Sequence, residues 1–424
     1  MTLEDLRHFP ETVWRKLREL SRKLWVRVLL YGALAILSLM IASPAGWILP
    51  DVVQEYLAGR GVDRLLNIIA NAMLAVTTFS LTVMVTVHRN TSTQWTPRLH
   101  MLVMEDTVTQ RTLATFIGAY VFALVAIVLR ELGVFPDAQT SVLFLVTVFV
   151  IVAIVYSLIR WVLHLQTFGS LLASTRTIES ETCNSLRARL SRPCLGATPL
   201  TDAVPEDATA IVATEAGYVQ MLYEQKLQSI AHEHDLDIYV PVPIGGFVSH
   251  RQPYLYVTGD VGDEVRDSIK NAVVLGDVRL ADQDPRFGLI MLSEIGSKAL
   301  SPGINDAGTA IDVITRIERI LSLYKDERDA HDIEFERLHI PPLSADDLLE
   351  DGLGQIARDG AGDYPVQCRL QKTYDALRRH PDDGMCDAAF DAAKSAYVRA
   401  MQDLTHEQDK QALSARVPDD IKPD

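Results

Sequence analysis

Four long apolar segments, separated by shorter polar stretches, dominate the first part of the chain. Each is close to the roughly 20 residues that an α-helix needs to cross the hydrocarbon core of a bilayer. The pattern therefore predicts a transmembrane domain at residues 25–168, with helices near 25–49, 65–87, 113–129 and 142–163. Residues 1–24 predict a separate amphipathic helix, in which Trp14, Leu17 and Leu20 share one face and basic residues occupy the rest. Such a helix can lie on the bilayer surface or pack against protein.

The polarity of the chain rises after Phe168, and the pattern there predicts a soluble region. Short β-like runs around a helical pattern at 222–234 predict a small α+β module. The predicted fold is an α-helical membrane protein with four transmembrane helices, followed by a cytosolic α+β region and a mainly helical C-terminal part. The soluble parts are a helix and linker at 169–209, the α+β module at 210–283, a helical region at 284–407 and a mobile tail at 408–424.

One stretch of the soluble region, from Phe287 to Leu321, predicts a helix, a break and a second helix. Apolar residues recur at helical spacing on both sides of the sequence Ser301-Pro302-Gly303. Proline disfavours helix at the residue before it, and glycine permits a turn. Asn305 or Asp306 can then cap the second helix.

This predicted corner has two interpretations. It brings a helix C-terminus and a helix N-terminus together, and a helix N-terminus attracts anions. The corner can therefore be an anion or ligand site formed by Lys298, Ser301, Asn305 and Asp306. The same residue types at these positions are also what capping alone selects, so a purely structural corner is the alternative.

The second apolar segment is unusually polar for a lipid environment. Its polar residues fall near one helical stripe: Asn67, Asn71, Thr78, Thr82 and Thr86. Such a stripe should face protein or water rather than acyl chains. It can line a solute path, or it can serve helix packing, with threonine side chains bonding to the preceding turn.

The third apolar segment carries small residues at four-residue spacing, in the pairs Ala114/Gly118 and Ala119/Ala123. Small residues let helix backbones approach closely in a membrane. The second and third segments are therefore expected to form the core of a bundle or an oligomer interface.

Charge is divided unevenly between the two parts. Residues 1–169 carry 14 Lys and Arg against 11 Asp and Glu, a net charge of +3, whereas the remainder carries 26 against 44, a net charge of −18. An acidic soluble region argues against a nucleic-acid partner. The four cysteines, at positions 183, 194, 368 and 386, show no CxxC spacing, which indicates reduced thiols rather than a zinc site.

The loops predict the orientation in the membrane. Basic residues flank the first segment and recur at 88–112, whereas the loops at 50–64 and 130–141 carry few. The positive-inside rule then puts both termini in the cytoplasm. The chain contains no GxGxxG, GxxxxGK[ST], HExxH or GxSxG motif, so no catalytic residue, cofactor or metal ion is assigned.

Several short motifs, in this order, resemble a bacterial family of predicted inner-membrane proteins known as domain of unknown function 2254. The matching pieces are FSLTV at 79–83, TPRL at 96–99, D-x-x-x-Q-R-x-L-x-x-F at 106–116, GYVQ at 217–220, GGFV at 245–248 and KALSPGIND at 298–306. The chain departs from the family pattern at Gly246 and at Ala307. The resemblance implies a bacterial cytoplasmic-membrane location with a cytosolic domain, and it implies no established activity.

These features together favour a non-enzymatic membrane protein. The leading hypothesis is an oligomeric channel or transport component gated by its cytosolic domain, with the lipid bilayer and further copies of the chain as partners. The alternative is a membrane-anchored sensor or scaffold, whose acidic domain binds a ligand or a protein partner.

The predicted topology can be tested with fused reporters. A reporter that fluoresces only in the cytoplasm should be bright when fused after Asp424, because this end is predicted to lie inside the cell. A reporter that is active only outside the cytoplasm should work near Gly59 or Asp137. Fluorescence and enzyme assays on whole cells measure both, and the reverse pattern would overturn the orientation.

Overall fold

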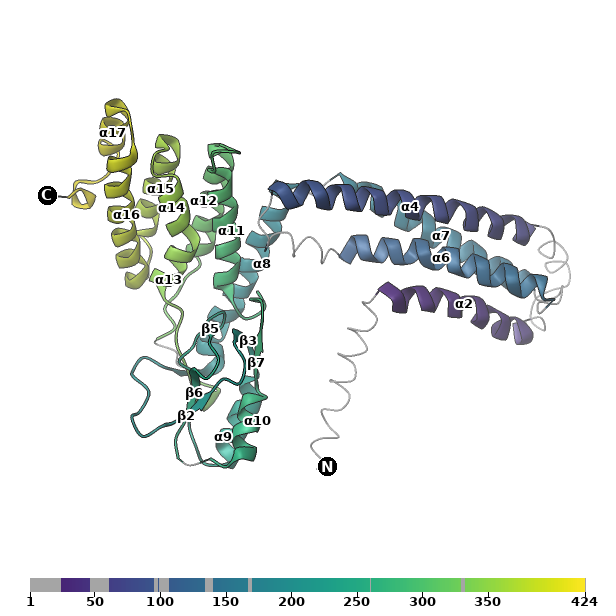
Figure 1. The fold of residues 1–424 in the computed structure, drawn as a ribbon, viewed down its shortest axis with the longest axis horizontal. Coiled ribbons are helices and arrows are strands. Elements are labelled where there is room, and N and C mark those ends of the chain that lie inside the picture. The colour runs from purple at the N-terminus through teal and green to yellow at the C-terminus, as the bar shows by residue number, and fades with distance from the viewer. Residues whose placement is uncertain are drawn as a thin grey trace. The chain divides into compact units, whose positions relative to one another are not determined.

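The chain divides into two compact units, which we call unit 1 (Met1–Ser170) and unit 2 (Leu171–Asp424). Figure 1 shows both units as they are described by a computed structural model. The structure describes residues 24–45, 61–94, 98, 107–133, 140–166, 170–259, 261–328 and 332–423.

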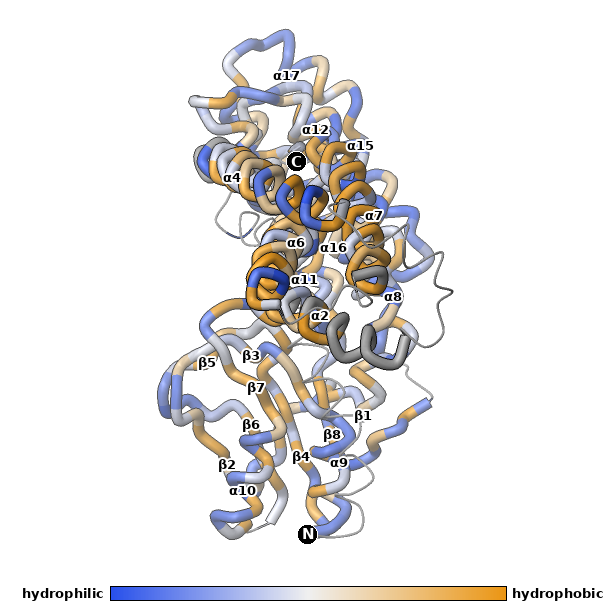
Figure 2. Tube along the Cα trace, turned by 90° about the vertical axis from the view of Figure 1, so that its right-hand side faces the viewer, coloured by the Kyte–Doolittle hydropathy of each residue, from blue (hydrophilic) through white to orange (hydrophobic). Residues whose placement is uncertain are grey.

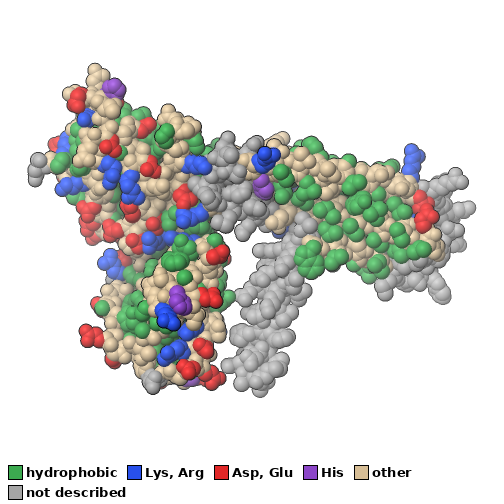
Figure 3. Space-filling model, viewed as in Figure 1, with side chains coloured by type: hydrophobic (Ala, Val, Ile, Leu, Met, Phe, Trp, Pro, Cys, Tyr) green, Lys and Arg blue, Asp and Glu red, His purple; other side chains and the backbone are tan. Residues whose placement is uncertain are grey.

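Unit 1 consists of long apolar helices. They are α2 (Leu24–Ala45), α4 (Gly61–Gln94), α6 (Thr107–Glu131) and α7 (Thr140–Leu165). Three of them contain stretches long and apolar enough to cross a membrane, at Gly61–Arg89, Val108–Glu131 and Val142–Leu165. These three confirm the second, third and fourth predicted segments. Figure 3 shows many hydrophobic side chains on the visible face of unit 1. The first predicted segment is helical as α2, whereas its end at 46–49 and most of the predicted amphipathic helix at 1–24 lie outside the described residues.

Helix α6 is the centre of unit 1, because it packs against α2, α4 and α7. Figure 2 shows hydrophobic residues along both α6 and α7. Phe116, Ala119, Phe122 and Ala123 on α6 are completely buried. At Gly118 the helices approach so closely that an added Cβ would lie 2.4 Å from the ring of Tyr31 on α2. The small residues of α6 therefore serve the core of the chain's own bundle, as one of the two expectations had it.

An ion pair fixes one end of this bundle. Arg130, in the last turn of α6, donates from Nη2 to Oδ2 of Asp63, in the first turn of α4, at 3.0 Å. The pair joins the end of one helix to the start of the other, so α4 and α6 run antiparallel.

Unit 2 begins with α8 (Leu171–Ser191), which packs against α11 (Pro285–Ala299) and α12 (Ala307–Leu321). Because α11 ends at Ala299 and α12 begins at Ala307, the predicted helix, break and helix at 287–321 are confirmed. Helices α8 and α11 meet where Gly288 faces Thr182, and a Cβ at Gly288 would lie only 1.8 Å from the Thr182 hydroxyl oxygen. This contact requires glycine, because a methyl group has no space there.

Several further helices complete the helical part of unit 2. They are α13 (Ala345–Leu349), the π-helical turn η3 (Glu350–Gly354), α14 (Gln355–Asp359), α15 (Tyr364–Leu377), α16 (Asp383–Asp403), α17 (Glu407–Ser414) and the 3₁₀ turn η4 (Asp419–Ile421). The predicted mobile tail at 408–424 instead holds most of α17 and all of η4. Leu413, Val417 and Ile421 are buried there, and this periodic apolar anchoring is what the prediction overlooked.

Two sheets and two helices form the α+β part. The strands are β1 (Ala197–Pro199), β2 (Thr209–Val212), β3 (Gly217–Leu222), β4 (Ile238–Tyr239), β5 (Phe247–Val248), β6 (Pro253–Val257), β7 (Val273–Gly276) and β8 (Phe335–Ile340). Helix α9 (Glu224–Glu233) packs on β8, and α10 (Asp263–Lys270) contacts α9. One sheet has the order β1-β8-β4-β6-β2 and the other the order β5-β3-β7.

The α+β part is larger than the predicted module at 210–283. Strand β8 pairs in parallel with both β1 and β4, and strands β1 and β8 both lie outside the predicted range. Parallel strands need a long crossover rather than a tight turn, so their pairing leaves no local signature in the sequence.

The close contact between α8 and α11 generates a stability prediction. Gly288→Ala should lower the free energy of unfolding by about 1–3 kcal/mol, because overpacking a tight core contact costs this much. Gly262→Ala is the matched control, since a Cβ there meets nothing within 4 Å. Calorimetry of the detergent-solubilised full chain would measure both melting temperatures, and equal values would contradict the assigned contact.

Candidate functional site

The polar stripe of α4 faces away from the bundle of unit 1. All five predicted stripe residues are exposed: Asn67, Asn71, Thr78, Thr82 and Thr86. Only 17% of the most apolar part of α4 is buried, against 50% of the corresponding part of α6. The described helices of unit 1 therefore leave the stripe uncovered.

The threonines of the stripe bond to their own helix. Thr78 donates its hydroxyl to the Leu74 carbonyl at 2.9 Å, Thr82 donates to Thr78 at 2.9 Å, and Thr86 donates to Thr82 at 2.8 Å. These bonds to the preceding turn satisfy the hydroxyl hydrogens without any other helix. The threonines can therefore face lipid, water or protein.

The two asparagines of the stripe differ from each other. Asn67 donates from its side-chain amide to the Asp63 carbonyl at 2.8 Å. The side-chain amide of Asn71 makes no hydrogen bond within the described residues. Asn71 is thus the stripe residue whose side chain has no hydrogen-bond partner within the described residues.

A second polar side of α4 lies inside the bundle. Ser80 is completely buried, and the hydroxyl oxygens of both Thr77 and Ser80 are buried without a partner in the described part of the chain. In α7, by contrast, the buried Thr147 has a partner, since it donates to the Leu143 carbonyl at 2.7 Å.

The structure brings the four residues of the predicted corner together between α11 and α12. Asp306 is the N-cap of α12, and its Oδ1 accepts a hydrogen bond from the Thr309 amide at 3.0 Å. The Thr309 hydroxyl donates to the other carboxylate oxygen at 2.5 Å. This side-chain bond, followed by the backbone bond from Thr309, lowers the pKa of Asp306 below its usual value. Asp306 therefore stays ionised as a cap at neutral pH.

The other corner residues also contribute to the turn. Ser301 donates its hydroxyl to the Lys298 carbonyl at 2.6 Å, so it caps the end of α11. Asn305 adopts a left-handed backbone conformation with φ of +51°, which asparagine tolerates better than most residues. Ser301 and Asp306 thus already bond inside the corner in the way that capping predicts. Binding of an anion at Lys298, Ser301, Asn305 and Asp306 stays a prediction.

Unit 2 contains a buried ion pair that the sequence did not indicate. Arg189 at the end of α8 donates to Glu327 through Nε at 2.7 Å and through Nη2 at 2.9 Å. Their side chains are only 6% and 1% exposed. Glu327 also accepts from the Leu343 amide at 3.0 Å, and Arg189 also donates to the Pro341 carbonyl at 3.1 Å. The pair therefore joins α8 to the chain after α12 and to the chain after β8.

Cys194 lies beside this pair, with its sulfur 3.9 Å from Oε2 of Glu327. Burial, reinforced by the charge of Glu327, raises the pKa of the Cys194 thiol to about 12. A protonated, buried thiol is a poor nucleophile, so Cys194 belongs to the core rather than to a reactive centre. Among the described residues, no three His, Cys, Asp or Glu side chains lie close enough to hold a metal ion.

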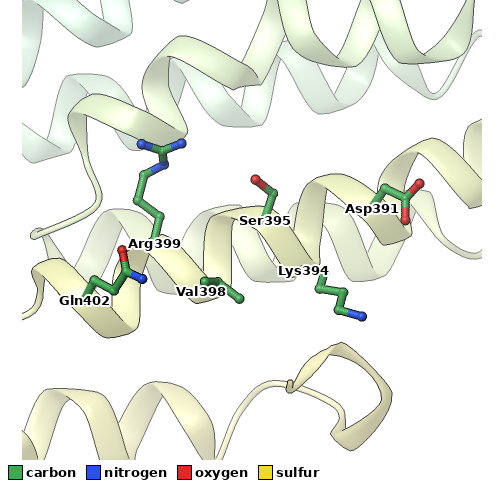
Figure 4. Close-up of a pocket in the computed structure, with 6 residues that line it drawn as sticks. All are labelled: Asp391, Lys394, Ser395, Val398, Arg399 and Gln402. Atoms are coloured by element: carbon green, nitrogen blue, oxygen red, sulfur yellow. The ribbon is translucent and has the colours of Figure 1, made fainter. Parts of the chain in front are cut away.

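The surface of α16 carries a shallow hollow of about 440 Å³ (Figure 4). Its lining comes from one helix only: Asp391, Lys394, Ser395, Val398, Arg399 and Gln402. It carries one acidic and two basic side chains, and no second element adds a lining residue. This hollow has the character of a solvated helix face, unlike the concave and mostly apolar sites that hold small ligands.

Comparison with known proteins adds the family. A family model described as "Predicted membrane protein (DUF2254)" matches residues 21–376. The chain is similar to an uncharacterised protein of Mycobacterium bovis and to one of Mycobacterium tuberculosis, each 25% identical over 209 residues. The match covers 47% of the chain and 40% of each relative, so the chain spans less than half the length of these curated relatives. No solved structure matches the chain.

The capping role of Asp306 can be tested by substitution. Asp306→Ala should lower the free energy of unfolding by about 0.5–2 kcal/mol at pH 7, because it removes an N-cap. The folded-state pKa of Asp306 is lowered, so its contribution is present above the unfolded-state pKa and is lost as the pH falls through the folded-state value. The difference between wild type and variant should therefore shrink on acidification.

Asp306→Asn is the matched control for this experiment, since asparagine also caps helices but carries no charge. Denaturant unfolding from pH 7 down to pH 3 would measure all three proteins. If Asp306→Ala is as stable as wild type at pH 7, the cap does not stabilise α12.

Proposed function

The chain belongs to the DUF2254 family of predicted membrane proteins, and we propose that it is an oligomeric channel or transport component. In this proposal the polar stripe of α4 lines the path of a small solute. The observation that carries the proposal is the exposure of five polar side chains on a helix of membrane length.

The physical argument starts from the hydrocarbon core of the bilayer. Polar side chains there favour contact with water or protein over contact with lipid. The described helices of unit 1 leave the stripe of α4 uncovered, whereas the small residues of α6 are already used against α2 and α4. Helix α4 is therefore the side of unit 1 at which further copies would enclose a polar path.

Unit 2 has a regulatory role in this proposal. Its cysteines are free thiols, which supports a reducing, cytoplasmic location for unit 2. The distribution of basic residues in the loops supports the same orientation in a bacterial inner membrane, with both termini in the cytoplasm. Since α8 follows the last membrane helix in the chain, a change in unit 2 can reach the path through α8.

A membrane-anchored sensor or scaffold is the second candidate. The observation that favours it is the bonding of the stripe threonines to their own helix, because such hydroxyls have no need of water. The net charge of −18 beyond residue 169 would then serve to bind a basic partner or a cationic ligand. The two candidates differ in whether a solute crosses the membrane.

Flux through liposomes distinguishes them. Loaded liposomes that contain the purified full chain should release ions or small neutral solutes faster than loaded liposomes without protein. The double change Thr78→Leu and Thr82→Leu should slow this release about tenfold, which corresponds to a barrier raised by about 1.4 kcal/mol when polar lining is lost.

Phe79→Leu is the matched control, because Phe79 is 63% exposed, lies at the same depth and remains apolar. Its release rate should equal that of the wild type. Absence of release for all tested solutes at several pH values would contradict a transport function and favour the sensor or scaffold.

A further inference from the structure

Asn71 is distinct among the polar residues that α4 exposes. Asn67, Thr78, Thr82 and Thr86 each donate a side-chain hydrogen bond to their own helix. The amide of Asn71 has no such bond within the described residues, and its side chain is exposed. It lies eight residues after Asp63, which is about 12 Å along the helix at 1.5 Å per residue. That depth is well inside the stretch Gly61–Arg89, which is long enough to cross a membrane.

An amide in this position needs a partner. Hydrocarbon supplies neither donors nor acceptors, so an unpaired amide there is strongly disfavoured. We infer that Asn71 is the point at which two copies of this chain associate, with each Asn71 amide donating to the Asn71 carbonyl oxygen of the other copy.

A second copy is the partner that the chemistry of this face fits. A carboxamide carries both donors and an acceptor, so it is complementary to itself across a two-fold axis. No charged residue lies between Arg64 and His88, so two copies of α4 can meet there without opposing like charges. Neighbouring Ala75 and Thr78 are small and exposed, which allows the two helices to approach closely.

This inference rests on the oligomer of the proposed function but not on conduction. It names the residue that holds the oligomer together, whereas the solute path depends on the threonines further along α4. Association and flux can therefore fail separately.

The first test measures association of the full chain in lipid vesicles by energy transfer between labelled copies, over a range of protein-to-lipid ratios. Asn71→Leu should weaken association about 5- to 30-fold, as expected when one or two hydrogen bonds between membrane helices are lost. Thr86→Val is the matched control and should leave association unchanged, because its hydroxyl is already bonded to the Thr82 carbonyl. Asn71→Gln should retain most of the affinity, since it keeps the carboxamide.

The second test is oxidative cross-linking, which does not depend on the stability of the leucine variant. Asn71→Cys should form a disulfide-linked dimer, whereas Ala72→Cys, at the same depth but about 100° around the helix, should not. The unmodified chain, whose four cysteines all lie beyond residue 170, gives the background.

Each outcome decides the inference. Equal cross-linking at positions 71 and 72, or unchanged association of Asn71→Leu, would overturn it and indicate that Asn71 faces water or lipid. Cross-linking at position 71 without solute release would uphold the inference and reject the channel. Solute release by a protein whose association does not depend on Asn71 would reject the inference and uphold the channel.

Discussion

Hydrocarbon offers no hydrogen bonds, and this single constraint accounts for much of unit 1. Each polar group inside the bilayer must be satisfied by its own helix, by a neighbouring helix or by water. Thr78, Thr82 and Thr86 take the first solution, since each bonds to the turn before it. Arg130 and Asp63 take the second, at the end of the bundle, where the ion pair joins the antiparallel helices α4 and α6. The amide of Asn71 takes neither of these solutions within the described residues, and the inferred association of two copies would supply its partner.

Unit 2 meets a related constraint, because a buried charge is unfavourable unless it is paired and hydrogen-bonded. Arg189 and Glu327 form a hydrogen-bonded ion pair at the C-terminal end of α8. Near the middle of α8, Glu179 accepts from Arg316, whose side chain is 5% exposed and which also donates to Asp312. Both pairs tie α8 to α12 or to the chain that follows it. Helix α8 is therefore an integral part of unit 2.

The features that the sequence predicted well are those written in local spacing. The apolar periods of α11 and α12, the break at Ser301-Pro302-Gly303 and the cap at Asp306 all depend on residues within a few positions of one another. What the sequence did not reveal depends on distant pairs. Strand β1 meets β8 across 138 positions, and Arg189 meets Glu327 across the same separation. The sequence near each of these residues contains no information about its distant partner. The local pattern therefore predicts the α+β module without strands β1 and β8.

The motifs that carry the family resemblance in unit 2 converge on α11. The piece GYVQ meets GGFV through paired backbone bonds between Val219 and the glycines 245 and 246, at 2.8 and 2.9 Å. Gly245 has φ of +79°, and a Cβ there would lie 2.1 Å from the carboxylate of Asp284, the N-cap of α11. The third piece, KALSPGIND, forms the opposite end of the same helix, where Ser301 and Asp306 already bond within the turn. These motifs thus lie at both ends of one helix, where Gly245 packs against Asp284 and Ser301 and Asp306 bond within the turn. On α4, by contrast, the exposed amide of Asn71 makes no hydrogen bond within the described residues, and it is this group that the inferred second copy would pair.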